Sequence, residues 1–217
     1  MKLYNLDASP FAARVRMLLR AKGHSLDLIP PPAPADFRAI TPLGKVPALV
    51  LDDGRVLPES EVINRYLDAV LDGPSLYPDD TESRVATELV TRLADLYLAV
   101  PLSDFFTLLF TAPGDRTAQQ AVIPDIARGL KYLDQTIATD GGFAAAGRFS
   151  HADCALVPML FYADGMLSAV AGQDLLEKRP NLKAYWLTIQ SHAAIAPVLD
   201  EMRAAAKKYQ SKLQAAQ

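Results

Sequence analysis

The feature that most constrains this chain is a change of pattern about one third of the way along it. Up to residue 71, short apolar runs bounded by turn residues alternate with segments of helical spacing. Between residues 72 and 80, Gly73, Pro74, Pro78 and several aspartates interrupt the pattern, and beyond them only helical spacing recurs. A chain of 217 residues divided in this way predicts two small domains, residues 1–73 and 81–217, joined by a linker over about 72–80.

The first part predicts the order β-α-β-α-β-β-α. Ser9 followed by Pro10 favours a helix start, because serine caps helices and proline suits the first helical position. Asp53-Gly54 is typical of a hairpin turn. The strands joined through the first helix should be parallel. The expected elements are a strand at 1–5, a helix from Ser9 to Gly23, strands at 25–29, 46–51 and 55–57, a short helix near Phe37 and a helix from Glu59.

The second part predicts packed helices only. Apolar residues recur at intervals of three and four, which marks a helix face that packs against other helices. Residues 150–171 should form an apolar helix in the middle of this domain, with further helices at 181–191 and 196–210. The two stripes expected to pack are Val85, Leu89, Leu93, Leu96 and Val100, and Val122, Ile126, Leu130, Leu133 and Ile137.

Composition argues against several classes of function. The net charge is −3 with acids and bases interspersed, so we expect no nucleic-acid partner. The opening MKLYNLDASP lacks a secretory pattern and no long uncharged apolar run follows, so we expect a cytoplasmic protein without a membrane segment. Cys154 is the single cysteine and His24, His151 and His192 lie far apart, so we expect no disulfide and no metal site.

Four motifs occur in a consistent order: SPFAARVRMLLRAKG from Ser9, TPLGKVPAL from Thr41, LPESEVINRYL from Leu57 and SHADCALVPML from Ser150. Each has an ordinary structural reading by itself, as a helix start, an X-Pro bond or a capping box. Together they resemble the cytosolic glutathione transferase family, of the serine type with omega- and tau-like features. The resemblance implies an α/β thioredoxin-like N-terminal domain and an all-α C-terminal domain.

The resemblance also implies a glutathione site in the first domain. Ser60, at a helix N-terminus, would receive the γ-glutamyl carboxylate, and Glu59 would accept from the γ-glutamyl ammonium. A cis Val46-Pro47 bond would present the backbone of Val46 to the cysteinyl amide, and Lys45 would meet the glycyl carboxylate.

Ser9 is the predicted catalytic residue. Its hydroxyl would donate to the glutathione sulfur and stabilise the thiolate, which is the nucleophile. Tyr4 is a weaker alternative donor. Serine stands where omega-type relatives carry cysteine, and because serine cannot form a mixed disulfide, thiol reductase activity is disfavoured.

The acceptor, a small hydrophobic electrophile, would bind between the domains near an aromatic cluster that could equally belong to the core. The family implies a homodimer and a role in detoxification. A non-catalytic binding or assembly module, and a glutathione-dependent isomerase or ether-cleaving enzyme, remain alternatives. The candidate acceptor residues are Phe11, Leu102, Phe105, Phe106 and Phe110.

Overall fold

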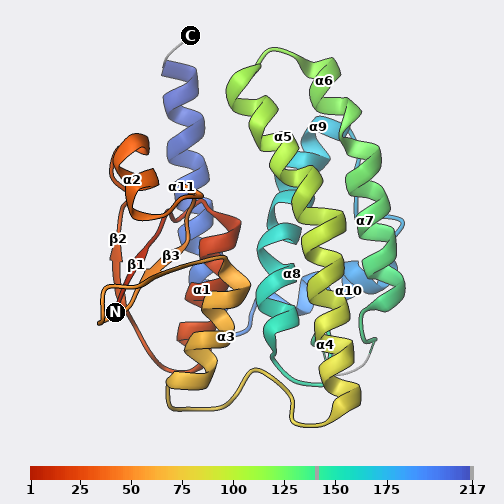
Figure 1. Ribbon diagram of the computed structural model, residues 1–217. Coiled ribbons are helices and arrows are strands. Elements are labelled where there is room, and N and C mark those ends of the chain that lie inside the picture. Colours follow the sequence, from red (N-terminus) through yellow and green to blue (C-terminus); the bar gives the residue numbers. More distant parts are fainter. Residues whose placement is uncertain (140–141, 216–217) are drawn as a thin grey trace. The chain divides into compact units, whose positions relative to one another are not determined.

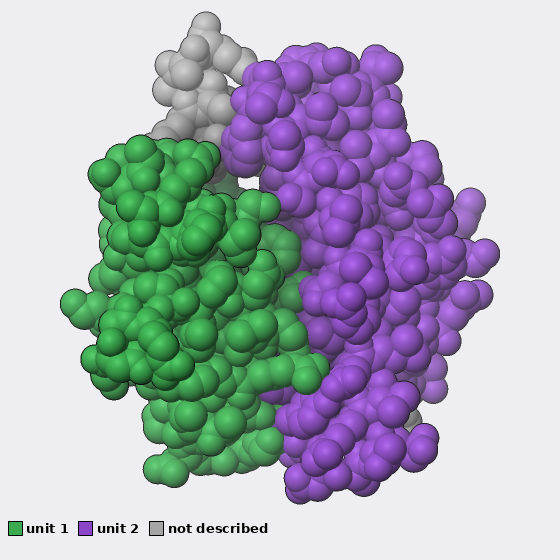
Figure 2. Space-filling view, in the orientation of Figure 1, with its two compact units in different colours: residues 1–76, 191–217 green, residues 77–190 purple. Residues whose placement is uncertain are grey.

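The computed structural model describes residues 1–139 and 142–215 (Figure 1). Its internal contacts divide the chain into two compact units (Figure 2). Unit 1 is Met1–Leu76 together with the residues from Ser191 onward, and unit 2 is Tyr77–Gln190. The last helix therefore groups by contact with the N-terminal residues, whereas the sequence placed it in a domain spanning 81–217. The predicted domain boundaries themselves stay a prediction.

Unit 1 contains a sheet of four short strands in the order β2-β1-β3-β4. The first two strands are parallel, and the other two neighbouring pairs are antiparallel. This arrangement confirms the predicted thioredoxin-like β-α-β-α-β-β-α order. The strands are β1 (Lys2–Tyr4), β2 (Asp27–Ile29), β3 (Ala48–Val50) and β4 (Val56–Pro58).

The strands are shorter than the sequence predicted. The apolar run 46–51 keeps only Ala48–Val50 as β3, and Pro47 before it cannot donate to a ladder. Gly54 turns the hairpin with a φ of 87°, a conformation that suits glycine, and β4 begins one residue later than expected.

The helices of unit 1 are α1 (Pro10–Ala21), α2 (Pro34–Ile40), α3 (Ser60–Val70) and α11 (Ala196–Ala215). A buried ion pair links the end of α1 to α3 and to the segment that follows α3. The Lys22 ammonium donates to a carboxylate oxygen of Asp68 at 3.0 Å and to the carbonyl of Pro74 at 3.1 Å. The same carboxylate accepts from the amide of Leu76, so the segment after α3 is fixed to the end of α1.

The regular elements among the described residues of unit 2 are all helices, as predicted. Two π-helical segments, η1 and η2, continue α4 and α8 without a break in the chain. The elements are α4 (Thr81–Leu93), η1 (Ala94–Ala99), α5 (Val100–Thr111), α6 (Arg116–Ala121), α7 (Ile123–Thr136), α8 (His151–Tyr162), η2 (Ala163–Leu167), α9 (Ser168–Ala171) and α10 (Pro180–Ile189).

The first predicted packing stripe is wrong, because most of it faces solvent. Thr87 and Thr91 of α4 and Leu98 of η1 are buried in its place. Four members of the stripe, Val85, Leu89, Leu96 and Val100, are exposed. We call these four residues the α4 stripe. The second stripe is confirmed on α7, where Ile126, Leu130, Leu133 and Ile137 are buried.

The predicted central helix begins with a buried capping box. The amide and the hydroxyl of Ser150 donate to Asp153 Oδ2 at 2.9 and 3.2 Å. The other carboxylate oxygen accepts from the amide of Ala144 at 2.9 Å and from the hydroxyl of Tyr185 at 3.0 Å. Burial raises the pKa of Asp153 to about 6 although these donors oppose the rise.

Two helical stretches, Thr81–Thr111 and His151–Ala171, are long and apolar enough to cross a bilayer by length and composition. Core helices of globular proteins pass the same test. In α8 nearly every side chain is buried within the fold, which is the pattern of a core helix.

Candidate functional site

The register of the sheet brings three predicted motifs to one end of unit 1. Tyr4, the last residue of β1, pairs with Ala48, the first residue of β3, and Ala48 pairs with Pro58, the last residue of β4. The loop that follows β1, the residues that precede β3 and the residues that follow β4 therefore emerge at the same edge. These three segments carry Ser9, Val46-Pro47 and Glu59-Ser60.

Ser9 caps α1 at this edge. Its backbone is extended, with φ −72° and ψ 121°, and its hydroxyl accepts from the amide of Ala12 at 3.2 Å. The Ser9 amide donates to the carbonyl of Leu6 at 2.9 Å. The side chain is half-buried, and among the described residues no acceptor takes the hydroxyl proton. Ser9 can therefore donate to a ligand while it keeps its cap.

Val46 and Lys45 lie on the second segment. The Val46–Pro47 peptide bond is cis. Val46 is half-buried, and within residues 1–139 and 142–215 its backbone amide and carbonyl form no hydrogen bond. Lys45 is exposed beside it. This segment can offer one donor and one acceptor to an extended peptide, with a cation next to them.

Glu59 and Ser60 form the third segment. Glu59 has φ 70°, a left-handed conformation that is costly for a side chain other than glycine and is often found at functional sites. Ser60 is the first residue of α3, which runs for 11 residues, and is 4% exposed. Its hydroxyl has no hydrogen-bond partner in the described part of the chain. The helix N-terminus adds unsatisfied amides and a positive partial charge.

This end of the sheet combines three features. The N-terminus of α3 can bind an anion, the Val46 backbone offers an amide and a carbonyl, and the Ser9 hydroxyl can donate a hydrogen bond. The helix start suits a carboxylate, and the Val46 backbone suits a peptide amide. The Ser9 hydroxyl, at the N-terminus of α1, suits an atom that develops negative charge. The site therefore suits a short peptide that carries a carboxylate at one end and an ionisable group in the middle.

The remaining predicted residues differ in how accessible they are. The ring of Tyr4 packs edge-on against Phe37, with centroids 5.1 Å apart. Leu102 and Phe105 are buried at 1% and 0% exposure, and their role in acceptor binding stays a prediction.

Phe11, Phe106 and Phe110 keep their place among the acceptor candidates. Phe11 is half-buried, with the guanidinium carbon of Arg14 5.2 Å from its ring centroid. Phe106 lies edge-on to Tyr162 at 4.8 Å and stacks on Phe110, which is 55% exposed. Their role in acceptor binding stays a prediction.

No group of three or more potential metal ligands occurs among the described residues. Cys154 is buried. The expected absence of a metal stays an expectation.

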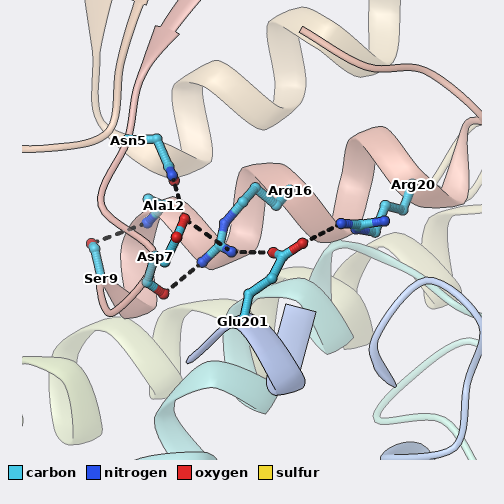
Figure 3. A network of polar contacts seen from close by, with 7 residues as sticks. All are labelled: Asn5, Asp7, Ser9, Ala12, Arg16, Arg20 and Glu201. Carbon is cyan, nitrogen blue, oxygen red and sulfur yellow. Dashed lines mark hydrogen bonds and ion pairs between the residues drawn. The ribbon is translucent and has the colours of Figure 1, made fainter. Parts of the chain in front are cut away.

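Sequence reasoning missed the polar contacts that hold the Ser9 loop. Arg16 of α1 is 3% exposed, donates to the carbonyl of Asp7 and forms an ion pair with Glu201 of α11 (Figure 3). Arg16 and Glu201 are separated by 185 residues in the chain, so no local pattern signals the pair.

Family models place the chain among known proteins. Residues 8–70 match the N-terminal domain of glutathione S-transferases, and residues 116–185 match the C-terminal domain. Together these matches cover more than half of the chain and include Ser9, Lys45, Val46, Glu59 and Ser60.

Individual relatives agree with the family models. The chain is 31% identical over 192 residues to glutathione S-transferase L1 of Arabidopsis thaliana, covering 85% of this chain and 75% of that protein. It is also 29% identical over 174 residues to a maleylacetoacetate isomerase of Pseudomonas aeruginosa, covering 76% of this chain and 82% of that protein.

A solved structure extends the comparison. A glutathione S-transferase from Methylobacillus flagellatus KT with glutathione bound superposes with a TM-score of 0.75 at 26% identity, covering 91% of this chain and 98% of that one. Fold and site thus define a two-part protein with a thioredoxin-like unit and a helical unit. The chain belongs to the glutathione S-transferase family.

Proposed function

We propose that this protein binds glutathione at the edge described above and transfers it, as the thiolate, to a small hydrophobic electrophile in the cytoplasm. The observation that carries the proposal is the strand register, which gathers Ser9, Val46 and Ser60 at one end of one sheet. The three segments come from distant parts of the chain, and each offers a group that one part of glutathione requires. A scaffold that had lost binding would have no need of all three.

Each part of glutathione has a proposed partner. The γ-glutamyl carboxylate binds the Ser60 hydroxyl and the first turn of α3, while Glu59 accepts from the ammonium group. The amide and carbonyl of Val46 pair with the cysteinyl residue as an added strand would. Lys45 is exposed on the same segment and meets the glycyl carboxylate.

Ser9 activates the sulfur without becoming a nucleophile. The thiol proton leaves to solvent, and the Ser9 hydroxyl donates a hydrogen bond to the thiolate that remains. The sulfur lone pair then forms a carbon–sulfur bond with the acceptor, and a leaving group, where the acceptor carries one, departs with the electron pair of its broken bond. Ser9 keeps its own proton throughout.

A second candidate function is glutathione-dependent isomerisation. The similarity to a maleylacetoacetate isomerase favours testing it, and the same thiolate is needed. The two reactions differ in their net consumption of glutathione, because isomerisation returns glutathione and conjugation consumes it. Incubation with maleylacetoacetate and with a panel of electrophiles, while free thiol is followed, separates them. Ether cleavage is recognised in the same panel by release of the alcohol.

We also propose a homodimer that covers the α4 stripe. Four exposed apolar side chains recur at helical spacing along the continuous helical stretch Thr81–Thr111, and exposed apolar clusters mark interaction surfaces. The occupant proposed is a second copy of this chain. Sedimentation of the wild type and of Leu89→Arg tests it, since a charge on this face should shift the dimer towards monomer. A wild-type protein that sediments as a monomer at micromolar concentration would contradict this part of the proposal.

Calorimetry with glutathione tests the proposed function itself. Ser60→Ala should weaken binding by about tenfold or more, because it removes a hydrogen bond to a charged group. Ser103→Ala is the matched control, since Ser103 is an exposed serine on α5 of unit 2. If the folded wild type showed no detectable binding at millimolar glutathione, both proposed reactions would be excluded. Only the alternative of a non-catalytic binding or assembly module would then remain.

A further inference from the structure

A buried arginine connects the Ser9 loop to the last helix of the chain. The Arg16 guanidinium lies inside unit 1, and one of its nitrogens donates to the carbonyl of Asp7 at 2.8 Å. Its other terminal nitrogen forms an ion pair with a carboxylate oxygen of Glu201 and lies 3.7 Å from the Asp7 carboxylate. Figure 3 shows this guanidinium between the loop and α11. The loop residue that it holds is two positions before Ser9.

The loop is bound from its other side as well. The side-chain amide of Asn5 donates to the Asp7 carboxylate at 2.9 Å. The backbone amide of Asn5 donates to the carbonyl of Ile29 in β2, and the Ser9 amide donates to Leu6, both at 2.9 Å. The start of the loop is thus anchored to the sheet and its middle to Arg16. Ser9 follows these two anchors directly and caps α1, so its backbone has little freedom.

Glu201 fixes the arginine in turn. Its two carboxylate oxygens bind Arg16 and Arg20, which lie one helical turn apart on the same face of α1. A buried guanidinium needs such a partner, because burial disfavours its charge. Without Glu201, Arg16 would keep only the Asp7 contacts or turn towards solvent. In either case the Asp7 carbonyl would lose the firmly held guanidinium that fixes the loop.

We propose that Glu201 is a positioning residue, which acts through Arg16 to aim the Ser9 hydroxyl at the glutathione sulfur. This inference rests on the proposed function for its catalytic meaning. The physical basis is the steep dependence of hydrogen bonding on direction: a donor that stabilises a thiolate must be held within a narrow range of angle and distance. A helix at the far end of the chain thereby controls the chemistry of residue 9.

Removing Glu201 would destabilise the protein even if its role were purely structural. A loss of unfolding free energy therefore does not distinguish a structural role from a positioning role. The two roles differ in whether the effect of Glu201 depends on the Ser9 hydroxyl. A positioning residue loses its catalytic effect once the group that it positions is gone. The experiment is therefore a double-mutant cycle of Glu201→Ala and Ser9→Ala. Its readout is the pKa of bound glutathione, followed by thiolate absorbance, together with kcat and KM.

Asp200→Ala is the matched control. Asp200 is the neighbour of Glu201 on α11 and forms an exposed ion pair with Arg203, away from the loop. Glu201→Gln is the second variant, since it keeps the size of the side chain and one acceptor while it removes the charge. Glu201→Gln replaces Glu201→Ala in the double-mutant cycle if the alanine variant does not fold.

In the Ser9 background, Glu201→Ala should raise the thiol pKa and lower kcat by about tenfold with little change in KM, because a small misplacement of a catalytic group is costly. In the Ser9→Ala background the same substitution should change neither quantity. Equal effects in both backgrounds, or no effect in the first, would overturn the proposal.

Hydrogen exchange of the ligand-free protein separates this inference from the proposed function. The Ser9 amide should exchange about tenfold faster in Glu201→Ala than in the wild type or Asp200→Ala, because local opening of the loop becomes easier. Unchanged exchange would overturn the clamp even if glutathione binds. Faster exchange in a protein that does not bind glutathione would support the clamp and overturn the proposed function.

Discussion

Two serines cap helices in the two units, and they differ in what takes the hydroxyl proton. Ser150 is fully buried at the start of α8, and its hydroxyl donates to Asp153. Ser9 is half-buried at the start of α1, accepts from Ala12, and has no described acceptor for its proton. The same residue in the same helical position is saturated in unit 2 and available in unit 1. An N-cap serine becomes a candidate catalytic residue when no acceptor in the protein takes its hydroxyl proton.

The largest effect on the structural side of this comparison should come from Asp153. Asp153→Ala should lower the free energy of unfolding by about 3–5 kcal/mol at pH 7, since four buried donors lose their acceptor. Urea unfolding followed by fluorescence of Trp186, a buried residue of α10 and the only tryptophan, measures it.

The control for this prediction is Asp125→Ala, which removes an exposed ion pair with Arg128 in the first turn of α7. An exposed pair of this kind contributes about 0.5 kcal/mol or less. Equal losses of stability in the two variants would show that the capping box of α8 is no more important than a surface contact.

The pH dependence of Asp153 gives the next largest effect. Its pKa is about 6 in the fold against an ordinary 3.8, so the folded protein holds this proton more tightly than the unfolded chain. The stabilisation from Asp153 is therefore fully present below about pH 4 and decreases as the pH rises through 6, by an amount on the order of 3 kcal/mol. The difference in unfolding free energy between wild type and Asp153→Ala should shrink from pH 4 to pH 7.5, and a difference that grows would contradict this assignment.

The two caps themselves give the smallest difference in stability. Ser150→Ala should cost about 1–2 kcal/mol, and Ser9→Ala about 0.5–1 kcal/mol, because one cap is buried and reciprocal and the other is half-exposed. Urea denaturation of both variants under one set of conditions provides the comparison. If Ser9→Ala were the more costly of the two, Ser9 would be primarily a structural residue.

Much of unit 1 could be predicted from the sequence, because its turn and cap residues act locally. Ser9-Pro10 begins α1 and Gly54 turns the hairpin in the predicted places. Strand ends were less predictable, since they depend on pairing partners, and β3 is shorter than its apolar run. The meeting of the three motifs at one edge follows from the register, which no single motif contains.

Two features required the structure. The α4 stripe has ideal helical spacing, but spacing shows only which residues share a face and not which face the fold covers; the stripe is exposed, and Thr87 and Thr91 are buried. The close approach of Gly129 on α7, where an added Cβ would come within 1.9 Å of the carbonyl oxygen of Tyr97, belongs to the same packing. The contact between Arg16 and Glu201 spans almost the whole chain, so periodicity could not reveal it.

The most direct test of the account is a titration of bound glutathione in the wild type, in Ser9→Ala and in Ser150→Ala. If the free hydroxyl of Ser9 stabilises the thiolate, Ser9→Ala should raise the pKa of the bound thiol by about two units and lower kcat at neutral pH by about 10²-fold, with little change in affinity. Ser150→Ala should leave that pKa unchanged, because its hydroxyl already donates to Asp153. Titration curves that coincide for wild type and Ser9→Ala would contradict the account and reduce Ser9 to a helix cap like Ser150.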